Sequence, residues 1–549
     1  MPKYLSLTSS FVLLIAFCTY AQVNSNQNKY TLADSLRGSL TSPLRTCYDL
    51  NYYHLSVKIN LDSQSISGNN VFKFTATTNF HQLQFDLFEN LSVDKILYHQ
   101  QPLNFKRKFN AVFVDFPKEI LNGELDSFVV FYSGQPIIAK RAPWDGGFVF
   151  AKHDGDKNWI ATVCQGIGAS IWWPNKDQQD DEVDSALISI TVPNDIMDVS
   201  NGRMIGKTDL KNGFTQYDWK VLNPINNYDI AINAANYFHF SDSYKGLNGD
   251  LSLDYYVLPE NELKAKKQFS DVKRMLAAFE YWFGPYPFYK DGYKLVETPH
   301  LGMEHQSAVA YGNQYKNGYL GRDLSGTGWG SKWDFIIVHE SGHEWFGNHI
   351  TAKDIADMWL HEGFTCYSES LFIEYWYGKE AGADYVIGLR KNILNKTPII
   401  GDYGVNNEGS SDMYYKGANL INMMRSLIND DKKWREILIG LNANFGKKTT
   451  TTLAVIDYIN QKSGIDFTKI VDQYLRFSAI PVLELKQENG KIACRWQSDV
   501  KNFDMPIQFE GDDQFFYPTS NWKGIKSSNK LDELKLNRNY YVDLKILNN

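Results

Sequence analysis

The chain has 549 residues, more than a single hydrophobic core usually serves, so its length predicts roughly two to four domains. Its hydrophobic content of 43%, aromatic content of 15% and charged content of 22% are those of an ordinary folded protein and exclude a disordered chain. The formal net charge of -7, with Lys and Arg scattered along the sequence, excludes the basic surface that nucleic-acid binding requires.

Residues 1–21 have the pattern of a secretory signal peptide. Lys3 precedes an apolar stretch at 11–17, and small residues precede the predicted cut before Gln22. Processing at Cys18 would give a lipid-anchored lipoprotein instead, but the bulky Phe17 disfavours it. Elsewhere the sequence has no apolar run of about 18 residues, the length a membrane-spanning helix needs. We therefore expect an exported protein, periplasmic or secreted, without a stable membrane span.

The mature chain has four cysteines and no C-x-x-C pair among them: Cys47, Cys164, Cys366 and Cys494. This spacing indicates neither a disulfide scaffold nor a thiolate zinc site. We expect buried free thiols, and a Cys47–Cys164 disulfide is the alternative left open.

Hydrophobic periodicity divides the mature chain into three parts and predicts a multidomain α+β protein. Apolar residues alternate with polar ones at Leu55, Val57 and Ile59 and again near Ile190, which predicts an antiparallel β domain over residues 22–246. Residues 247–478 are predicted to be mostly helical, because apolar residues recur every three or four positions. This spacing begins at Phe269, Val272, Leu276 and Phe279 and continues in residues 333–346, 358–377, 417–428 and 456–477. Alternation returns in residues 479–549, which predicts a small β module.

A short pattern within the helical part indicates a metal site. His339 and His343 are four residues apart and follow an apolar run, so both imidazoles lie on one face of a predicted helix and can hold one Zn²⁺ ion. Glu340, next to the first ligand, is the candidate catalytic base.

Zinc needs a third protein ligand, and the sequence offers two candidates. His349 has the spacing of a third histidine in H-E-x-x-H-x-x-G-x-x-H sites, but Phe346 stands where that motif has its turn-forming glycine. Glu362 lies on a second apolar-patterned helix and would complete a His₂Glu site.

The motifs resemble those of the gluzincin aminopeptidases, the family of aminopeptidase N and the leukotriene-processing epoxide hydrolases. Residues 339–348 read H-E-S-G-H-E-W-F-G-N, similar to the family's H-E-x-x-H-x-W-F-G-N, and residues 359–364 read W-L-H-E-G-F, similar to W-L-x-E-G-F. The resemblance implies one zinc ion per chain, with Glu362 as the third ligand and Glu340 as the base. It also implies that His349 is incidental.

Three further segments resemble the family's substrate-binding and catalytic positions. Residues 301–305, L-G-M-E-H, are similar to G-x-M-E-N, which implies that Glu304 binds the substrate's α-ammonium beside Gly302 and Met303. Leu301 and His305 depart from that pattern, which affects the shape of the first subsite. The resemblance further implies that Tyr414, in Y-Y-K-G-A, stabilises the tetrahedral intermediate and that Gln165, after Cys164, helps to bind the amino terminus.

The resemblance also implies a fold and a function. The expected fold is an amino-terminal β saddle, a thermolysin-like catalytic domain and a small β-sandwich, without the family's large carboxy-terminal helical domain and therefore with a more open cleft. The expected function is a zinc metallo-aminopeptidase that removes residues from peptides with a free amino terminus. Epoxide hydrolysis and zinc-dependent peptide binding without catalysis are the alternatives. The sequence leaves the side-chain preference and the oligomeric state open.

Overall fold

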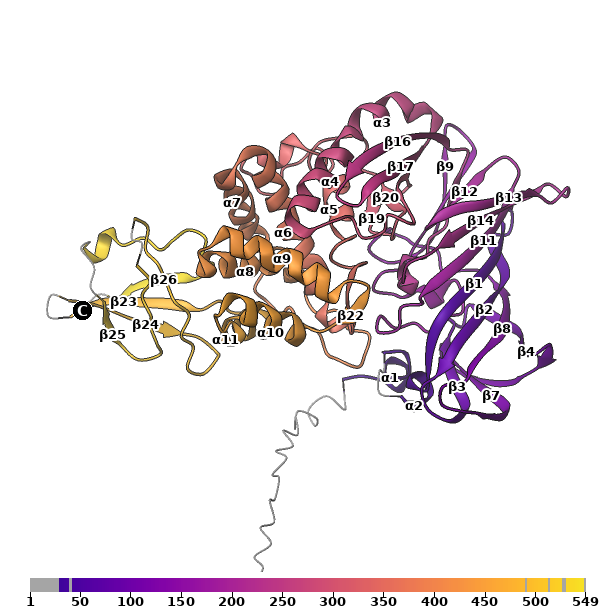
Figure 1. The fold of residues 1–549 in the computed structure, drawn as a ribbon, viewed down its shortest axis with the longest axis horizontal. Coiled ribbons are helices and arrows are strands. Elements are labelled where there is room, and N and C mark those ends of the chain that lie inside the picture. Colours follow the sequence, from indigo (N-terminus) through magenta and orange to yellow (C-terminus); the bar gives the residue numbers. More distant parts are fainter. Residues whose placement is uncertain (1–28, 39–41, 489–490, 512–513, 526–529, 548–549) are drawn as a thin grey trace, which may run out of the picture.

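The computed structural model describes residues 29–38, 42–488, 491–511, 514–525 and 530–547. The predicted signal peptide lies outside these residues. Figure 1 shows the amino-terminal strands at one end, the strands β23 to β26 at the other, and helices α4 to α11 between them. In the part of the chain that the structure describes, no helix combines the length and the hydrophobicity needed to cross a membrane.

The amino-terminal part is β-rich, as predicted, and its largest sheet has eight strands. Leu55, Val57 and Ile59 all point into its core, since each is at most 2% exposed. The prediction of an antiparallel domain was wrong where β1 and β11 pair in parallel. Their separation along the chain leaves room for the long connection that a parallel pair requires. The order of the sheet is β13 (Arg203–Asp209), β14 (Phe214–Val221), β11 (Ser185–Pro193), β1 (Tyr48–Asn60), β2 (Ser65–Ala76), β8 (Leu125–Gly134), β4 (Leu91–Tyr98) and β5 (Gln101–Pro102).

Two smaller sheets complete this part. One has the order β3 (Phe80–Asp86), β7 (Ala111–Ile120) and β6 (Asn104–Lys108). The other has the order β12 (Met197–Val199), β15 (Asn233–Ala235), β10 (Lys157–Val163) and β9 (Gly147–His153). The end of β10 leads directly to Cys164 and Gln165, so this second sheet carries Gln165 toward the helical part.

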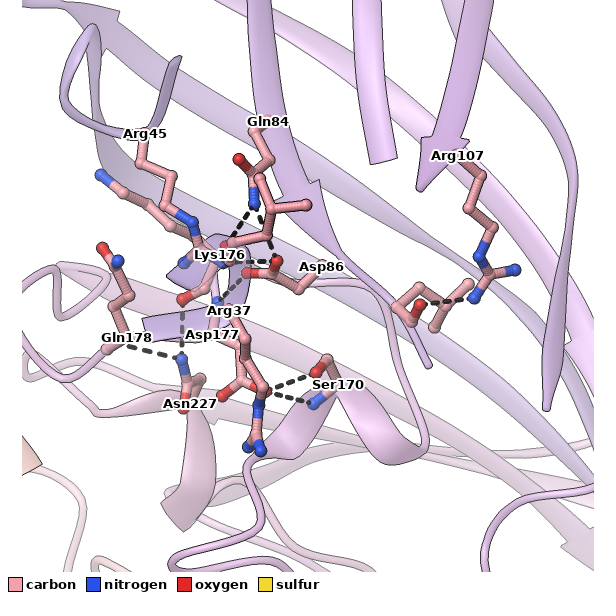
Figure 2. Close-up of polar contacts among 12 residues, drawn as sticks. Arg37, Arg45, Gln84, Asp86, Arg107, Ser170, Lys176, Asp177, Gln178 and Asn227 are labelled. Carbon is pink, nitrogen blue, oxygen red and sulfur yellow. Dashed lines mark hydrogen bonds and ion pairs between the residues drawn. The ribbon is translucent and has the colours of Figure 1, made fainter. Parts of the chain in front are cut away.

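The first helices, α1 (Leu32–Gly38) and α2 (Pro43–Thr46), are joined to the β domain by buried charges (Figure 2). Arg45, fully buried, pairs with Asp86 at 2.5 Å and donates to the carbonyl of Leu36 at 2.8 Å. Arg37 lies 3.7 Å from Asp177, whose backbone N–H donates to Asp86. Because each of these charges has a partner of opposite sign, the contacts hold α1 and α2 against β3.

A five-stranded sheet begins the mostly helical part, with the order β16 (Phe238–Gly246), β17 (Gly249–Val257), β18 (Tyr293–Glu297), β20 (Val309–Tyr311) and β19 (Gly302–Met303). Its pairs β17–β18 and β18–β20 are parallel. The predicted boundary between residues 246 and 247 falls in the turn between β16 and β17, and the domain boundaries stay a prediction. Strand β19 brings Gly302, Met303 and the following Glu304 to the edge of this sheet.

Helices pack against this sheet and carry most of the remaining core. The predicted stretch 456–477 is two helices, because Gly464 has a φ of +79° and ends the first of them. Two helices that the sequence did not predict, α7 and α9, alternate with the predicted ones. The helices are α3 (Glu262–Gln268), α4 (Ser270–Phe283), α5 (Phe335–Gly342), α6 (Trp359–Tyr377), α7 (Lys379–Gly388), α8 (Tyr415–Ile428), α9 (Asp431–Phe445), α10 (Thr452–Ser463) and α11 (Thr468–Arg476). A short parallel pair, β21 (Ile350–Ala352) and β22 (Lys448–Thr450), lies beside them.

The carboxy-terminal part is a β module, as predicted. Its four-stranded sheet has the order β25 (Lys523–Ile525), β24 (Lys491–Gln497), β23 (Val482–Glu488) and β26 (Asp543–Leu547). Leu485 and Trp496 from this sheet belong to the same hydrophobic core as the helices. In the described residues the rest of the module pairs through isolated bridges, Ile507 with Phe516 and Phe509 with Leu536.

The cysteines follow the main expectation. Cys47, Cys164, Cys366 and Cys494 are all buried and free, so the alternative of a Cys47–Cys164 disulfide was wrong.

Candidate functional site

Helix α5 presents the two histidines of the predicted metal site. Its first turn is capped by Asp334, whose carboxylate accepts from the backbone N–H groups of Ile336 and Ile337. His339 lies in the last turn, His343 caps the carboxyl end, and the centres of the two rings are 5.1 Å apart. The sequence therefore positions both imidazoles on one face, as the four-residue spacing predicts.

Hydrogen bonds fix the tautomer of both rings. His339 Nδ1 donates to Glu369 Oε1 at 2.7 Å, and His343 Nδ1 donates to the carbonyl of Phe346 at 3.0 Å. Carboxylates and carbonyls only accept, so Nδ1 carries a proton in each ring and Nε2 is the nitrogen left to bind a metal. Tyr385 donates to the other oxygen of Glu369 at 2.7 Å and holds that carboxylate in place. Such outer partners orient histidines that bind metals.

Glu362, in the first turn of α6, lies against both histidines. Its Oε2 is 3.6 Å from His339 Nε2 and 3.4 Å from His343 Nε2. This oxygen is buried and accepts no hydrogen bond within the described part of the chain. Three ligand atoms that face one another without direct hydrogen bonds fit a cation between them, and the His₂Glu set is one that zinc takes.

The other candidate for the third ligand lies elsewhere. His349 Nδ1 is 3.2 Å from Asn442 Oδ1, and the ring packs against Phe288. Glu362 Oε2, by contrast, lies within 3.6 Å of Nε2 of both His339 and His343. Among the described residues, these two histidines and Glu340 have ligand atoms within 4.8 Å of one another. The short distances to both histidines therefore favour Glu362 over His349.

Glu340 is buried beside the histidines and lines the same cleft. Its carboxylate fits there because the neighbouring residue, Gly302, has no side chain. A methyl group on Gly302 would lie 2.9 Å from Glu340 Oε1 and 2.9 Å from the Ile336 side chain. Gly302 therefore allows the edge strand β19 to approach α5 closely.

The buried carboxylates create a field that favours positive charge. Burial opposes protonation of His343, but Glu304 and Glu362 outweigh it and raise its pKa to about 9. Burial also opposes ionisation of Glu362, but His343 and His339 outweigh it and lower its pKa. Burial raises the pKa of Glu340 to about 7, because the neighbouring imidazoles compensate only part of the desolvation. The same field that stabilises an imidazolium would stabilise a bound cation.

Glu304 lines the same cleft as the histidines. It is 2% exposed, and its Oε1 accepts from the Gln165 amide and, at 3.3 Å, from the hydroxyl of Tyr228. The structure thus brings Gln165 from the β domain and Glu304 from the mostly helical part into direct contact. Burial raises the pKa of Glu304, and the nearby His343 offsets part of that shift, so a cationic group bound beside this carboxylate would stabilise its ionised form.

Residues 339–348, the segment with the predicted zinc-binding motif, hold the backbone that carries Glu304. Asn348 Nδ2 donates to the carbonyl of Glu304 at 2.7 Å, and Glu344 accepts from the backbone N–H of Ser307 at 2.8 Å. Tyr286 also donates to Glu344, at 3.2 Å. Glu344 and Asn348 therefore position the 304–307 loop, a role for which spacing alone gave no signal.

Tyr414 directly precedes α8 and lies beside the metal cluster. Its ring stacks on His339 with the centres 6.2 Å apart, and burial, followed by the charge of Glu362, raises its pKa well above the usual value. The phenol is therefore a proton donor rather than a phenolate.

These groups open onto one cleft of about 790 Å³. All predicted site residues line it: Gln165, Gly302, Met303, Glu304, His339, Glu340, His343, Glu362 and Tyr414. Sequence reasoning missed Glu369, which also lines the cleft. Its position seven residues after Glu362 on the same helix face was an available signal.

Comparison with known proteins agrees with this geometry. Residues 268–474 match the Peptidase family M1 domain. Endoplasmic reticulum aminopeptidase 1 of Mus musculus is 23% identical over 254 residues, covering 44% of this chain and 27% of that protein. Aminopeptidase 2 of Candida albicans is 20% identical over 511 residues, covering 88% of this chain and 52% of its own length. The chain thus spans about half or less of these relatives.

Solved structures share the fold over most of the chain. An M1 zinc metallopeptidase from Deinococcus radiodurans superposes with a TM-score of 0.67 at 18% sequence identity, covering 81% of this chain and 98% of that one. A mutant of the same protein was solved with a Tyr-Ser-Ala substrate bound, with the same TM-score. Residues 268–474 therefore match the Peptidase family M1 domain, and the chain is similar to aminopeptidases in sequence and to an M1 zinc metallopeptidase in fold.

Proposed function

We propose that the protein is a zinc-dependent aminopeptidase that hydrolyses the first peptide bond of peptides with a free amino terminus. The observation that carries the proposal is that one cleft holds both a cation-binding cluster and a buried carboxylate. Glu362 Oε2 lies within 3.6 Å of Nε2 of both His339 and His343 and accepts no hydrogen bond from the described residues. Glu304, which is buried and lines the same cleft, is a partner for an ammonium group.

His339, His343 and Glu362 would hold one zinc ion, and their donor set fits that metal. When bound, zinc supplies a Lewis acid that makes water a better nucleophile near neutral pH and polarises the scissile carbonyl. Glu340 accepts a proton from the attacking water and then donates it to the leaving amine. Tyr414 donates a hydrogen bond to the oxygen that becomes negative during the attack.

Glu304 and Gln165 would select for the amino terminus. Glu304 accepts from the α-ammonium of the substrate, and Gln165 contributes a neutral amide beside it. An acetylated amino terminus has no charge to offer this carboxylate, and its extra atoms would meet the buried pocket wall. The cleft therefore supports exopeptidase action, and the M1 relatives named as aminopeptidases support the same assignment.

The test compares a free peptide with its N-acetylated form, with and without a metal chelator. We expect cleavage of the free peptide only, loss of cleavage with the chelator, and recovery with added zinc. Equal rates on the acetylated peptide would refute the aminopeptidase assignment.

The Glu340→Gln variant tests the role of the base separately. It removes the proton acceptor but none of the proposed ligands, so we expect one zinc ion per chain and a fall in kcat of at least about a hundredfold. Metal content measured beside turnover separates loss of the base from loss of the ion. Turnover close to that of the wild-type protein would sink the mechanism.

Two further parts of the proposal concern the ends of the chain. We infer export from the signal-peptide pattern of residues 1–21, which amino-terminal sequencing of the exported protein would test. We also infer that the carboxy-terminal module is a small β-sandwich. Its four-stranded sheet and the additional bridges at 507–516 and 509–536 support that assignment.

A further inference from the structure

One acidic side chain in the cleft has no role in the mechanism above. Glu408 lines the cleft and takes part in no hydrogen bond or ion pair with the described residues. Glu304, Glu340, Glu362 and Glu369 each have a partner or a role there. None of the described residues that line the cleft is a lysine or an arginine, so no resident cation neutralises Glu408.

Contacts place Glu408 at the end of the cleft where the amino terminus would bind. A methyl group on Gly166 would lie 3.5 Å from Glu408 Oε2, and Asn406 Nδ2 donates to the carbonyl of Gly166 at 2.7 Å. Gly166 directly follows Gln165, which donates to Glu304. The Glu408 carboxylate therefore borders the segment that carries the proposed ammonium site.

Glu408 is exposed to solvent, and it lines the same cleft as Glu362. Its partial enclosure there, followed by the charge of Glu362, raises its pKa. Zinc would balance Glu340 and Glu362 in charge, and the substrate ammonium would balance Glu304. Glu408 would then remain as an unbalanced negative charge near the side chain of the first residue.

We propose that Glu408 is a specificity-determining residue that favours peptides whose first residue is lysine or arginine. The inference rests on the proposed aminopeptidase function, because it assumes that Glu304 anchors the α-ammonium. The first residue carries its ammonium group and its side chain on the same carbon. Anchoring at Glu304 therefore directs a long basic side chain into the space beside Gly166 and Glu408. A charge-assisted hydrogen bond to the carboxylate would hold it there.

The experiment measures kcat/KM for the zinc-loaded enzyme on lysyl, arginyl, norleucyl and leucyl coumarinamides. Norleucine has the stem of lysine without the ammonium, so the lysyl-to-norleucyl ratio isolates the charge. We expect a ratio of about ten or more for the wild-type enzyme, because charged hydrogen bonds contribute at this level. Glu408→Gln should bring the ratio close to one and leave norleucyl turnover within about twofold.

Asp145 provides a matched control, since it lines the same cleft but already accepts from the backbone N–H groups of Lys140 and Arg141. Asp145→Asn should retain the lysyl preference. The proposal is overturned by a wild-type ratio near or below one, by a loss of preference in Asp145→Asn but not in Glu408→Gln, or by an equal fall on all substrates in Glu408→Gln.

These outcomes separate the two proposals. Chelator-sensitive cleavage of leucyl and norleucyl substrates without a basic preference leaves the aminopeptidase assignment intact and removes only the role of Glu408. If the enzyme cleaves none of the four substrates, both the aminopeptidase proposal and the role of Glu408 are overturned.

Discussion

Glu369 illustrates how a residue outside the proposed ligand set prepares the metal site. It accepts from His339 Nδ1 and from the hydroxyl of Tyr385, and it is 1% exposed. The carboxylate fixes the ring so that Nε2 faces Glu362 and makes the imidazole a better electron donor. Glu369 therefore acts on zinc indirectly, and its effect can be measured as a change in the affinity of the protein for zinc.

We expect Glu369→Ala to weaken zinc binding by about ten- to a hundredfold, because the imidazole loses both its orientation and its charged partner. Competition with a chromophoric chelator measures the affinity directly, and excess zinc should restore much of the activity. Tyr385→Phe removes only the hydrogen bond to the far oxygen and should have a smaller effect. An unchanged zinc affinity in folded Glu369→Ala would show that the contact between Glu369 and His339 does not affect zinc binding.

The same region shows what spacing can and cannot predict about single residues. His339, Glu340 and His343 follow from helix periodicity, since four residues bring side chains to one face. Glu362 needed the family resemblance, because His349 had an equally suitable chemistry. The contacts of Gln165 with Glu304 and of Glu344 with Ser307 join distant segments, and no local pattern encodes a contact between them.

At the scale of elements, two glycines set the distance between the helix that carries Glu362 and the one that follows Tyr414. A methyl group on Gly417 of α8 would lie 3.1 Å from the Cα of Gly363 on α6. The backbones of the two helices therefore touch without side chains between them. Gly363 directly follows the proposed ligand Glu362, and Gly417 lies three residues after Tyr414, the proposed oxyanion donor. The packing of the two helices therefore affects the geometry of the site.

We expect Gly417→Ala to lower the free energy of unfolding by roughly 1–3 kcal/mol, because the added methyl group forces α6 and α8 apart. The shift also moves Tyr414, so kcat should fall while KM changes little. Thermal unfolding and steady-state kinetics measure the two effects. Ser426→Ala, farther along α8, is the control and should change neither. A Gly417→Ala protein as stable and active as the wild type would contradict the close-contact argument.

The elements themselves were predictable where one period dominates. Alternation identified β1 and β11 of the β domain, and three-to-four spacing identified α4, α6 and α8. The parallel pairing of β1 with β11 was not predictable, because the sequence of a strand does not determine which other strand it pairs with. The break at Gly464 and the unpredicted α7 and α9 show that periodicity locates helical regions better than it divides them.

At the scale of the whole molecule, the β domain contacts the mostly helical part through Glu182, an acid whose charge depends on pH. Glu182, just before β11, accepts from the hydroxyl of Thr351 in β21. Nearby, Lys447 donates to Asn223 at 2.7 Å, so two contacts join the same parts. Burial raises the pKa of Glu182 from 4.5 to about 7, and the neighbouring Asp181 adds to the shift. Ionising Glu182 in the folded protein therefore costs free energy, and this cost weakens the contact between the two parts.

We expect Glu182→Gln to be more stable than the wild type at alkaline pH and to lose that advantage under mildly acidic conditions. Because the pKa is higher in the folded protein, the fold keeps a proton that the unfolded chain loses between pH 4.5 and about 7. The resulting stabilisation is full below pH 4.5 and disappears as the pH rises through about 7. Glutamine does not titrate, so the difference in unfolding free energy should change by roughly 1–2 kcal/mol between about pH 5 and about pH 8.5. Thermal unfolding of both zinc-loaded proteins across this range measures it, and a difference that stays constant with pH would show that Glu182 ionises normally in the folded protein.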